Sequence, residues 1–107
     1  MTTDIHAHRD ALAARAQENL QDLIDTLEGK IGILGTLIEF PERSTTEQDR
    51  LKAKIRGIEA GLNLAKTAIS PTTAAMEMAE LLPLVPSDEK SGLEIALQDA
   101  RLLARLP

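Results

Sequence analysis

Apolar residues recur at alternating steps of four and three positions along two stretches of the chain, and this spacing is the strongest constraint on its fold. The first stretch comprises Leu20, Ile24, Leu27, Ile31, Leu34 and Ile38. The second comprises Leu51, Ile55, Ile58, Leu62, Ala65 and Ile69. Such spacing puts each set on one side of a helix, where a helix with a matching stripe can pack against it. The sequence therefore predicts two long helices that face each other.

Helix ends follow from prolines and capping residues. Pro41 ends the first helix, predicted at about 4–39, because proline disfavours the helical conformation in the residue before it. Ser44 followed by Glu47 fits a capping box, so the second helix is predicted at about 45–69. The loop between them is short, which makes the two helices antiparallel neighbours.

Two more helices complete the predicted fold. Ser70 and Pro71 stop the second helix and begin a short third helix at about 72–82. Ser87 is expected to cap a fourth helix at about 88–105. Leucine and alanine dominate the apolar residues, and only 1% of the residues are aromatic, which favours helices over strands. We therefore predict an all-α, four-helix-bundle-like single domain over 1–107, with residues 1–11 expected to fray where the apolar spacing fades.

Charge and composition narrow the class of protein. The chain has 17 acidic and 12 basic residues and a net charge of −5, which favours solubility and weighs against a general nucleic-acid binder. It has no cysteine, which excludes disulfides and thiolate chemistry. The longest uncharged apolar run, 31–38, is too short for a membrane span, and no signal peptide is recognisable. We expect a soluble, cytoplasmic protein with no membrane contact.

The sequence offers no residues in a catalytic or cofactor-binding pattern. It has no glycine-rich phosphate loop, no Glu-x-x-His pair and no serine in a recognisable triad context. His6 and His8 would point about 200° apart on a helix, which prevents them from sharing a metal ion. We therefore predict that the protein is not an enzyme and binds no metal or cofactor.

Glycines inside the first two helices are candidate close-packing residues, because each costs about 0.5–1 kcal/mol unless a close contact offsets it. On the second helix, Gly57 and Gly61 fall on one face with Ala53 and Ala68. We interpret this face as the contact for the third or fourth helix, with a homodimer contact as the alternative. The glycines of the first helix are Gly29, Gly32 and Gly35.

The glycine-rich end of the first helix is apolar on several sides, which suits a place where more than one helix converges. We predict that Gly32 or Gly35 lies against another helix. The same interpretation predicts that three neighbouring apolar residues are among the most buried in the protein: Ile31, Leu34 and Ile38.

Two charged clusters are candidate partner contacts. The basic cluster consists of Arg50, Lys52, Lys54 and Arg56, and the acidic cluster of Glu18, Asp22 and Asp25. Cations near a helix N-terminus oppose the helix dipole, and such a local conflict can mark contact with an acidic surface or a phosphate backbone. An ordinary solvated face is the alternative. An antiparallel hairpin does not bring the two clusters together, so direct pairing would need a second copy or another protein.

These observations favour a small helical protein-protein interaction module of the adaptor, chaperone or inhibitor type. It would act through apolar helix faces, as a homodimer, with another protein or itself as partner. The alternative hypothesis is a nucleic-acid contact through the basic start of the second helix, which would weaken with salt.

Overall fold

The computed structural model describes residues 2–40 and 43–105, with side chains described from residue 11 onward. In these ranges the chain forms four α-helices and one short 3-10 helix, with no strand. These elements are α1 (Thr2–Ile38), α2 (Thr45–Thr67), α3 (Pro71–Leu81), η1 (Leu82–Leu84) and α4 (Lys90–Ala104). The predicted all-α, bundle-like fold is confirmed. The side chains of residues 1–10, which include His6 and His8, lie outside the described side chains. The predicted fraying of residues 1–11 therefore stays a prediction.

Serine side chains begin α2 and α3, as the sequence predicted. The Ser44 hydroxyl accepts a hydrogen bond from the backbone N–H of Glu47 at 3.2 Å. The Ser70 hydroxyl accepts one from the backbone N–H of Thr73, also at 3.2 Å, and a proline occupies the first turn of α3. Each bond satisfies one of the free N–H groups of a helix start and fixes where the chain turns.

The start of α4 differs from the prediction. Ser87 lies in a turn that the backbone N–H of Glu89 closes by donating to the carbonyl of Pro86 at 2.9 Å. The helix begins only after this turn, and the residue before it makes no side-chain capping bond. The prediction that Ser87 caps the fourth helix is therefore wrong, because the turn moves the helix start past it.

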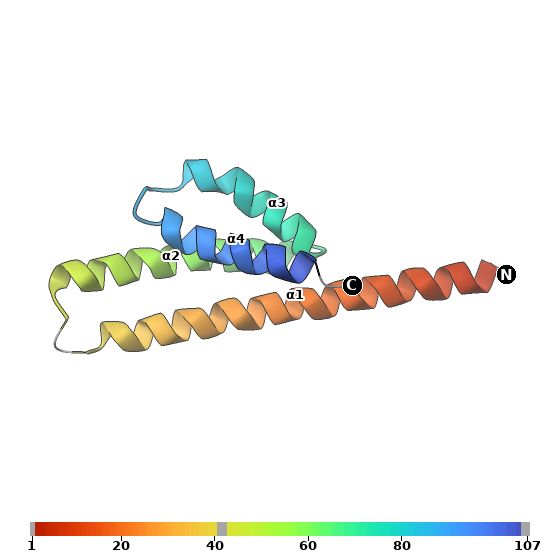
Figure 1. Ribbon diagram of the computed structural model, residues 1–107, viewed down its shortest axis with the longest axis horizontal. Coiled ribbons are helices and arrows are strands. Elements are labelled where there is room, and N and C mark those ends of the chain that lie inside the picture. Colours follow the sequence, from red (N-terminus) through yellow and green to blue (C-terminus); the bar gives the residue numbers. More distant parts are fainter. Residues whose placement is uncertain (1, 41–42, 106–107) are drawn as a thin grey trace.

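The helices form a hairpin of α1 and α2 with α4 laid against both and α3 covering α2 and α4 (Figure 1). Both α2 and α4 run antiparallel to α1, and α3 returns in the opposite direction to α4 (Figure 1). The largest fully buried side chains come from all four helices: Leu23, Leu27, Ile58, Met78 and Leu93. The core therefore lies where four helices meet, around the middle of α1.

The prediction that Ile31, Leu34 and Ile38 are among the most buried residues is wrong, because each is only partly buried. Of the first apolar stripe only Leu20 and Leu27 are buried, and Leu23, which the stripe does not include, is fully buried beside them. The physical reason is that the helices leave openings at this level of α1. Leu34 borders an opening between α1, α2 and α4, and Ile31 borders another between α1 and α2.

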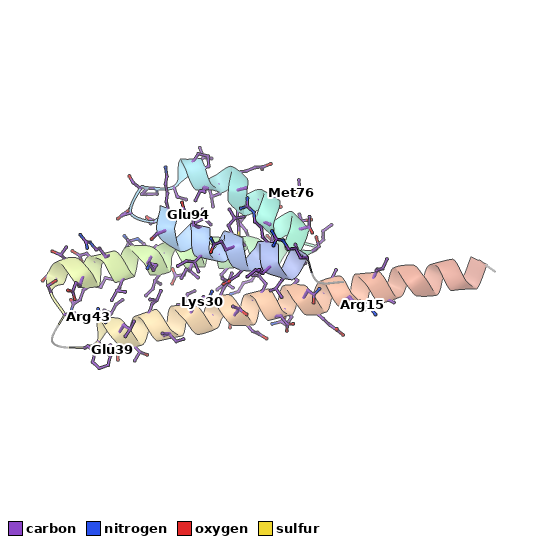
Figure 2. The ribbon with its side chains drawn as sticks, viewed as in Figure 1. Arg15, Lys30, Glu39, Arg43, Met76 and Glu94 are labelled. Carbon is purple, nitrogen blue, oxygen red and sulfur yellow. The ribbon has the colours of Figure 1, made fainter. Side chains whose placement is uncertain are left out.

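The opposite end of α1 extends beyond the other helices (Figure 1). In Figure 2, Arg15 lies on this projecting part of α1, whereas Lys30 lies alongside α4. The molecule measures 64 × 27 × 19 Å, and its radius of gyration is 16.6 Å. A compact domain of this length would have a radius of gyration of about 13 Å. The chain is therefore markedly elongated.

Candidate functional site

The structure places Gly57 and Gly61 against α4. A Cβ atom on Gly57 would lie 2.1 Å from the backbone oxygen of Glu89, and one on Gly61 would lie 2.4 Å from the Cβ of Ala96. These distances leave no room for a side chain, so the two helix backbones approach each other as closely as glycine permits. Within the described chain, the small-residue face of α2 is thus occupied by its own fourth helix.

Gly92 is the counterpart on α4, and the sequence analysis missed it. A Cβ there would lie 2.0 Å from the backbone oxygen of Lys54. The signal was available, because small residues recur at steps of four on both helices. They are Gly57, Gly61 and Ala65 on α2, and Gly92, Ala96 and Ala100 on α4, and all six are buried. Matching small-residue stripes on two helices indicate that those two helices pack together.

The glycines of α1 lie in different surroundings. No atom of another helix would come within 4 Å of a Cβ atom at Gly29, Gly32 or Gly35. The prediction that Gly32 or Gly35 lies against another helix is therefore wrong for the single chain. The other helices pack against the leucine side of α1 and leave the side that carries Gly29 and Gly32 open.

The basic cluster does not form a single face. The Arg56 guanidinium lies 3.6 Å from a carboxylate oxygen of Asp88 and 3.5 Å from one of Glu89, in the turn before α4. Lys52 is exposed. The two remaining cations, Arg50 and Lys54, line a polar pocket elsewhere on α2. Arg56 is therefore paired within the chain, although its side chain stays half exposed.

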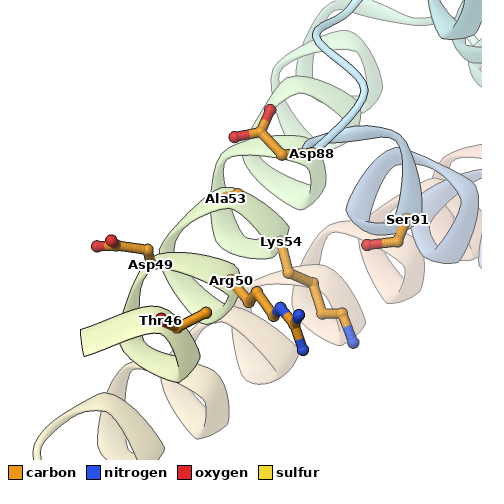
Figure 3. Close-up of a pocket in the computed structure, with 7 residues that line it drawn as sticks. All are labelled: Thr46, Asp49, Arg50, Ala53, Lys54, Asp88 and Ser91. Atoms are coloured by element: carbon orange, nitrogen blue, oxygen red, sulfur yellow. The ribbon is translucent and has the colours of Figure 1, made fainter. Parts of the chain in front are cut away.

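The polar pocket has a volume of about 560 Å³ and lies between α2 and the start of α4. Its lining residues are Thr46, Asp49, Arg50, Ala53, Lys54, Asp88 and Ser91. Figure 3 shows that the side chains of Arg50 and Lys54 extend in the same direction, whereas Asp49 points to the opposite side. The pocket thus has a cationic side and an acidic side.

The acidic cluster lies on the outer side of α1. Glu18, Asp22 and Asp25 are all exposed. Asp25 accepts a hydrogen bond from Nε2 of Gln21 at 2.9 Å. Because α1 and α2 are antiparallel, this cluster and the basic start of α2 lie toward opposite ends of the hairpin (Figure 1). The structure does not bring the two clusters together.

An apolar groove of about 320 Å³ opens between α1, α2 and α4. We call it the α1–α4 groove, and its lining residues are Lys30, Ile33, Leu34, Lys54, Ile58, Ile95, Gln98 and Asp99. Ile33 is 64% exposed at its edge, whereas Ile58 is fully buried at its base. The ammonium group of Lys30 forms an ion pair and hydrogen bond with the carboxylate of Asp99 across the groove. This groove could not be predicted from sequence, because it depends on where α4 lies.

Chemically, this site can hold a ligand by apolar contact and charge. In the part of the chain whose side chains are described, no group of three or more histidine, cysteine or acidic residues could hold a metal ion. Among the described residues, no helix is both long and apolar enough to cross a membrane. Comparison of the chain with protein-family models, curated proteins and solved structures gives no match.

Proposed function

We propose that the chain is a soluble, cytoplasmic helical protein-interaction module that binds an amphipathic helix of another protein in the α1–α4 groove and acts as a homodimer. The observation that carries the proposal is the groove itself, where α1 leaves the apolar side chain of Ile33 open to a partner and α4 contributes the partly buried Ile95. Such a module would serve as an adaptor, chaperone or inhibitor. Its action would be to cover or present a helix of its partner.

The lining of the groove fits a helix as occupant. Each of the three helices contributes one isoleucine to the lining: Ile33 of α1, Ile58 of α2 and Ile95 of α4. A helix that carries apolar residues at every third or fourth position can seat them in such a groove. Apolar burial would supply most of the binding free energy, at roughly 25 cal/mol per Å² of apolar surface removed from water.

Charge around the groove specifies the kind of helix. The carboxylate of Asp99 is paired with Lys30. Lys54, which borders both the groove and the polar pocket, forms no ion pair among the described residues. Arg50 extends beside it (Figure 3). We infer that the partner helix carries an acidic residue that meets Lys54 where the groove adjoins the polar pocket.

The nucleic-acid hypothesis has less support. A phosphate backbone needs several free cations on one face, whereas Arg56 is paired with Asp88 and Glu89. Asp49 and Asp88 also line the polar pocket that contains Arg50. Repulsion between these carboxylates and phosphate would oppose binding, so we favour a protein partner.

Site-specific photo-cross-linking tests the proposal. A photoreactive residue at Ile33 should capture one protein in the source cells. The same residue at Met76 should not capture it. Met76 is a suitable control because it is 62% exposed, close to the 64% of Ile33, but lies on α3 (Figure 2).

The captured segment decides the outcome. The proposal expects an amphipathic helix with an acidic flank, and weaker capture when Lys54→Glu is added. With purified proteins, Ile33→Asp should lower the affinity roughly tenfold or more, the size expected for losing one well-placed apolar contact. Equal capture at positions 33 and 76, or capture of a basic or extended segment, would contradict the proposal.

A further inference from the structure

The first half of α1 has no companion helix in the part of the chain that the structure describes. We call residues 2–18 the N-terminal arm, and Figure 1 shows it projecting past the ends of α2 and α4. From residue 11 to residue 18 its described side chains are exposed, except that of Ala16, which is partly buried. The arm is about 25 Å long at 1.5 Å per residue. Nothing within the described chain covers it.

The arm has an apolar stripe in phase with the core. Leu12 and Ala16 precede Leu20, Leu23 and Leu27 at helical steps of three or four, so they face the same side of α1. That side is buried at Leu20, Leu23 and Leu27, but Leu12 is 49% exposed. The arm continues the packed part of α1, but most helix stability in proteins comes from packing of the apolar side. A partner on this stripe would supply the packing that the arm lacks.

The exposed area of the chain is large enough for a stable interface. The solvent-accessible surface is 6992 Å². A compact monomer of 11.6 kDa would expose about 5,800 Å², so the chain has an excess of roughly 1,150 Å². A standard protein-protein interface buries about 800 Å² on each partner. The excess is thus of the size that a dimer would remove.

The direction of the helices specifies how a second copy would fit. Both α2 and α4 run antiparallel to α1 and end near the base of the arm (Figure 1). They leave Ile69 80% exposed just after α2, and Leu102 59% exposed near the end of α4. An arm that enters antiparallel to α1 would run in the direction of α2 and α4. Its N-terminus would then meet their C-terminal ends, where the helix dipoles attract.

We infer that two copies of this chain pair through their N-terminal arms as an antiparallel, two-fold symmetric dimer. In this dimer, Leu12 and Ala16 of each copy pack against the arm of the other. A parallel pairing on the same stripe would bring both bundles to one end, where α2 and α4 already occupy the stripe side of α1. The antiparallel arrangement places the bundles at opposite ends and closes the interface on itself.

This inference rests on the homodimer part of the proposed function, but it does not use the α1–α4 groove. The test is light scattering of the purified full chain at high micromolar concentration. We expect the mass of a dimer for the native chain and half that mass for the double variant Leu12→Glu, Ala16→Glu. Met76→Glu is the matched control, since it also charges an exposed apolar residue but lies off the arm, and it should remain dimeric.

A distance measurement tests the antiparallel geometry. Because the chain has no cysteine, a single cysteine at Glu39, at the far end of α1, can carry a spin label. In the antiparallel dimer the two labels lie farther apart than the 64 Å length of one molecule. In a parallel dimer they lie close together. A short distance, or an unchanged dimer mass for the arm variant, would overturn the inference, as would a native monomer.

The two proposals can fail separately. Thermal unfolding should show that the arm variant keeps its folded bundle, because Leu12 lies outside the core. Cross-linking at Ile33 should then persist in the monomeric variant. Loss of the dimer with retained cross-linking would show that dimerisation uses the arm and partner binding uses the groove. Absence of cross-linking in a normal dimer would remove the groove proposal alone.

Discussion

The glycines of this protein fall into two groups with opposite surroundings. At the contact of α2 with α4, Gly57 and Gly92 lie so close together that an added Cβ atom would overlap backbone atoms. Along α1, Gly29, Gly32 and Gly35 would meet no atom of another helix. The comparison teaches that an interior glycine indicates a close helix contact only when a second helix offers a matching small-residue stripe. α4 offers that stripe to α2, and nothing in the described chain offers one to the glycines of α1.

The largest expected effect comes from closing the gap between α2 and α4. Gly57→Ala and Gly92→Ala would each place a methyl group 2.1 Å and 2.0 Å, respectively, from a backbone oxygen. A backbone cannot move aside without separating the helices. The cost should therefore exceed the roughly 1–3 kcal/mol of ordinary overpacking. Urea denaturation should find both variants largely unfolded, and a native midpoint for either would contradict the close contact.

A second comparison sets the two ends of the α1 stripe against each other. Leu27 is fully buried beneath the other helices, whereas Leu34 is partly buried because it borders the open α1–α4 groove. Leu27→Ala should lower the free energy of unfolding by about 3 kcal/mol and Leu34→Ala by about 1 kcal/mol, because the second site leaves a smaller cavity. Chemical denaturation of the two variants checks this. Equal losses would show that the α1–α4 groove encloses Leu34 as fully as the core encloses Leu27.

The contact at Gly61 can be tested with a second substitution, at Ala96, that makes room for the first. A methyl group there would lie 2.4 Å from the Cβ atom of Ala96, a side-chain atom that mutation can remove. Gly61→Ala should cost about 2 kcal/mol by overpacking. Adding Ala96→Gly should recover part of that loss, reduced by the roughly 1 kcal/mol cost of a new helix glycine. Additive losses in the double-mutant cycle would mean that the two positions do not touch.

The fold was largely predictable because its signals are local. Apolar spacing located α1 and α2, and the caps at Ser44 and Ser70 follow from residues three or fewer positions away. The predicted start of α4 was wrong because the turn before it depends on a backbone hydrogen bond, donated by the N–H of Glu89 to the carbonyl of Pro86. No sequence pattern predicted that bond.

The candidate site was less predictable, since it depends on where α4 lies along the hairpin. That position brings Ile95 of α4 into the same groove as Ile33 of α1. It also decides that Leu27 is buried and Ile38 only partly so. Periodicity alone treats every position of a stripe alike, so it could not separate the enclosed half of α1 from its open half. The Gly92 stripe could have shown which two helices meet.

The smallest expected effect is a stabilisation, and it tests the glycines of α1, which no other helix covers in the described chain. Gly32→Ala adds a methyl group where no atom of another helix lies within 4 Å. Alanine loses less backbone entropy than glycine in a helix, so the free energy of unfolding should rise by about 0.5–1 kcal/mol. Thermal or urea unfolding of the isolated chain measures this gain. A destabilised variant would mean that a second helix covers the Gly32 side of α1 in solution. A stabilised variant that no longer binds the captured partner would mean that the partner contacts α1 at Gly32.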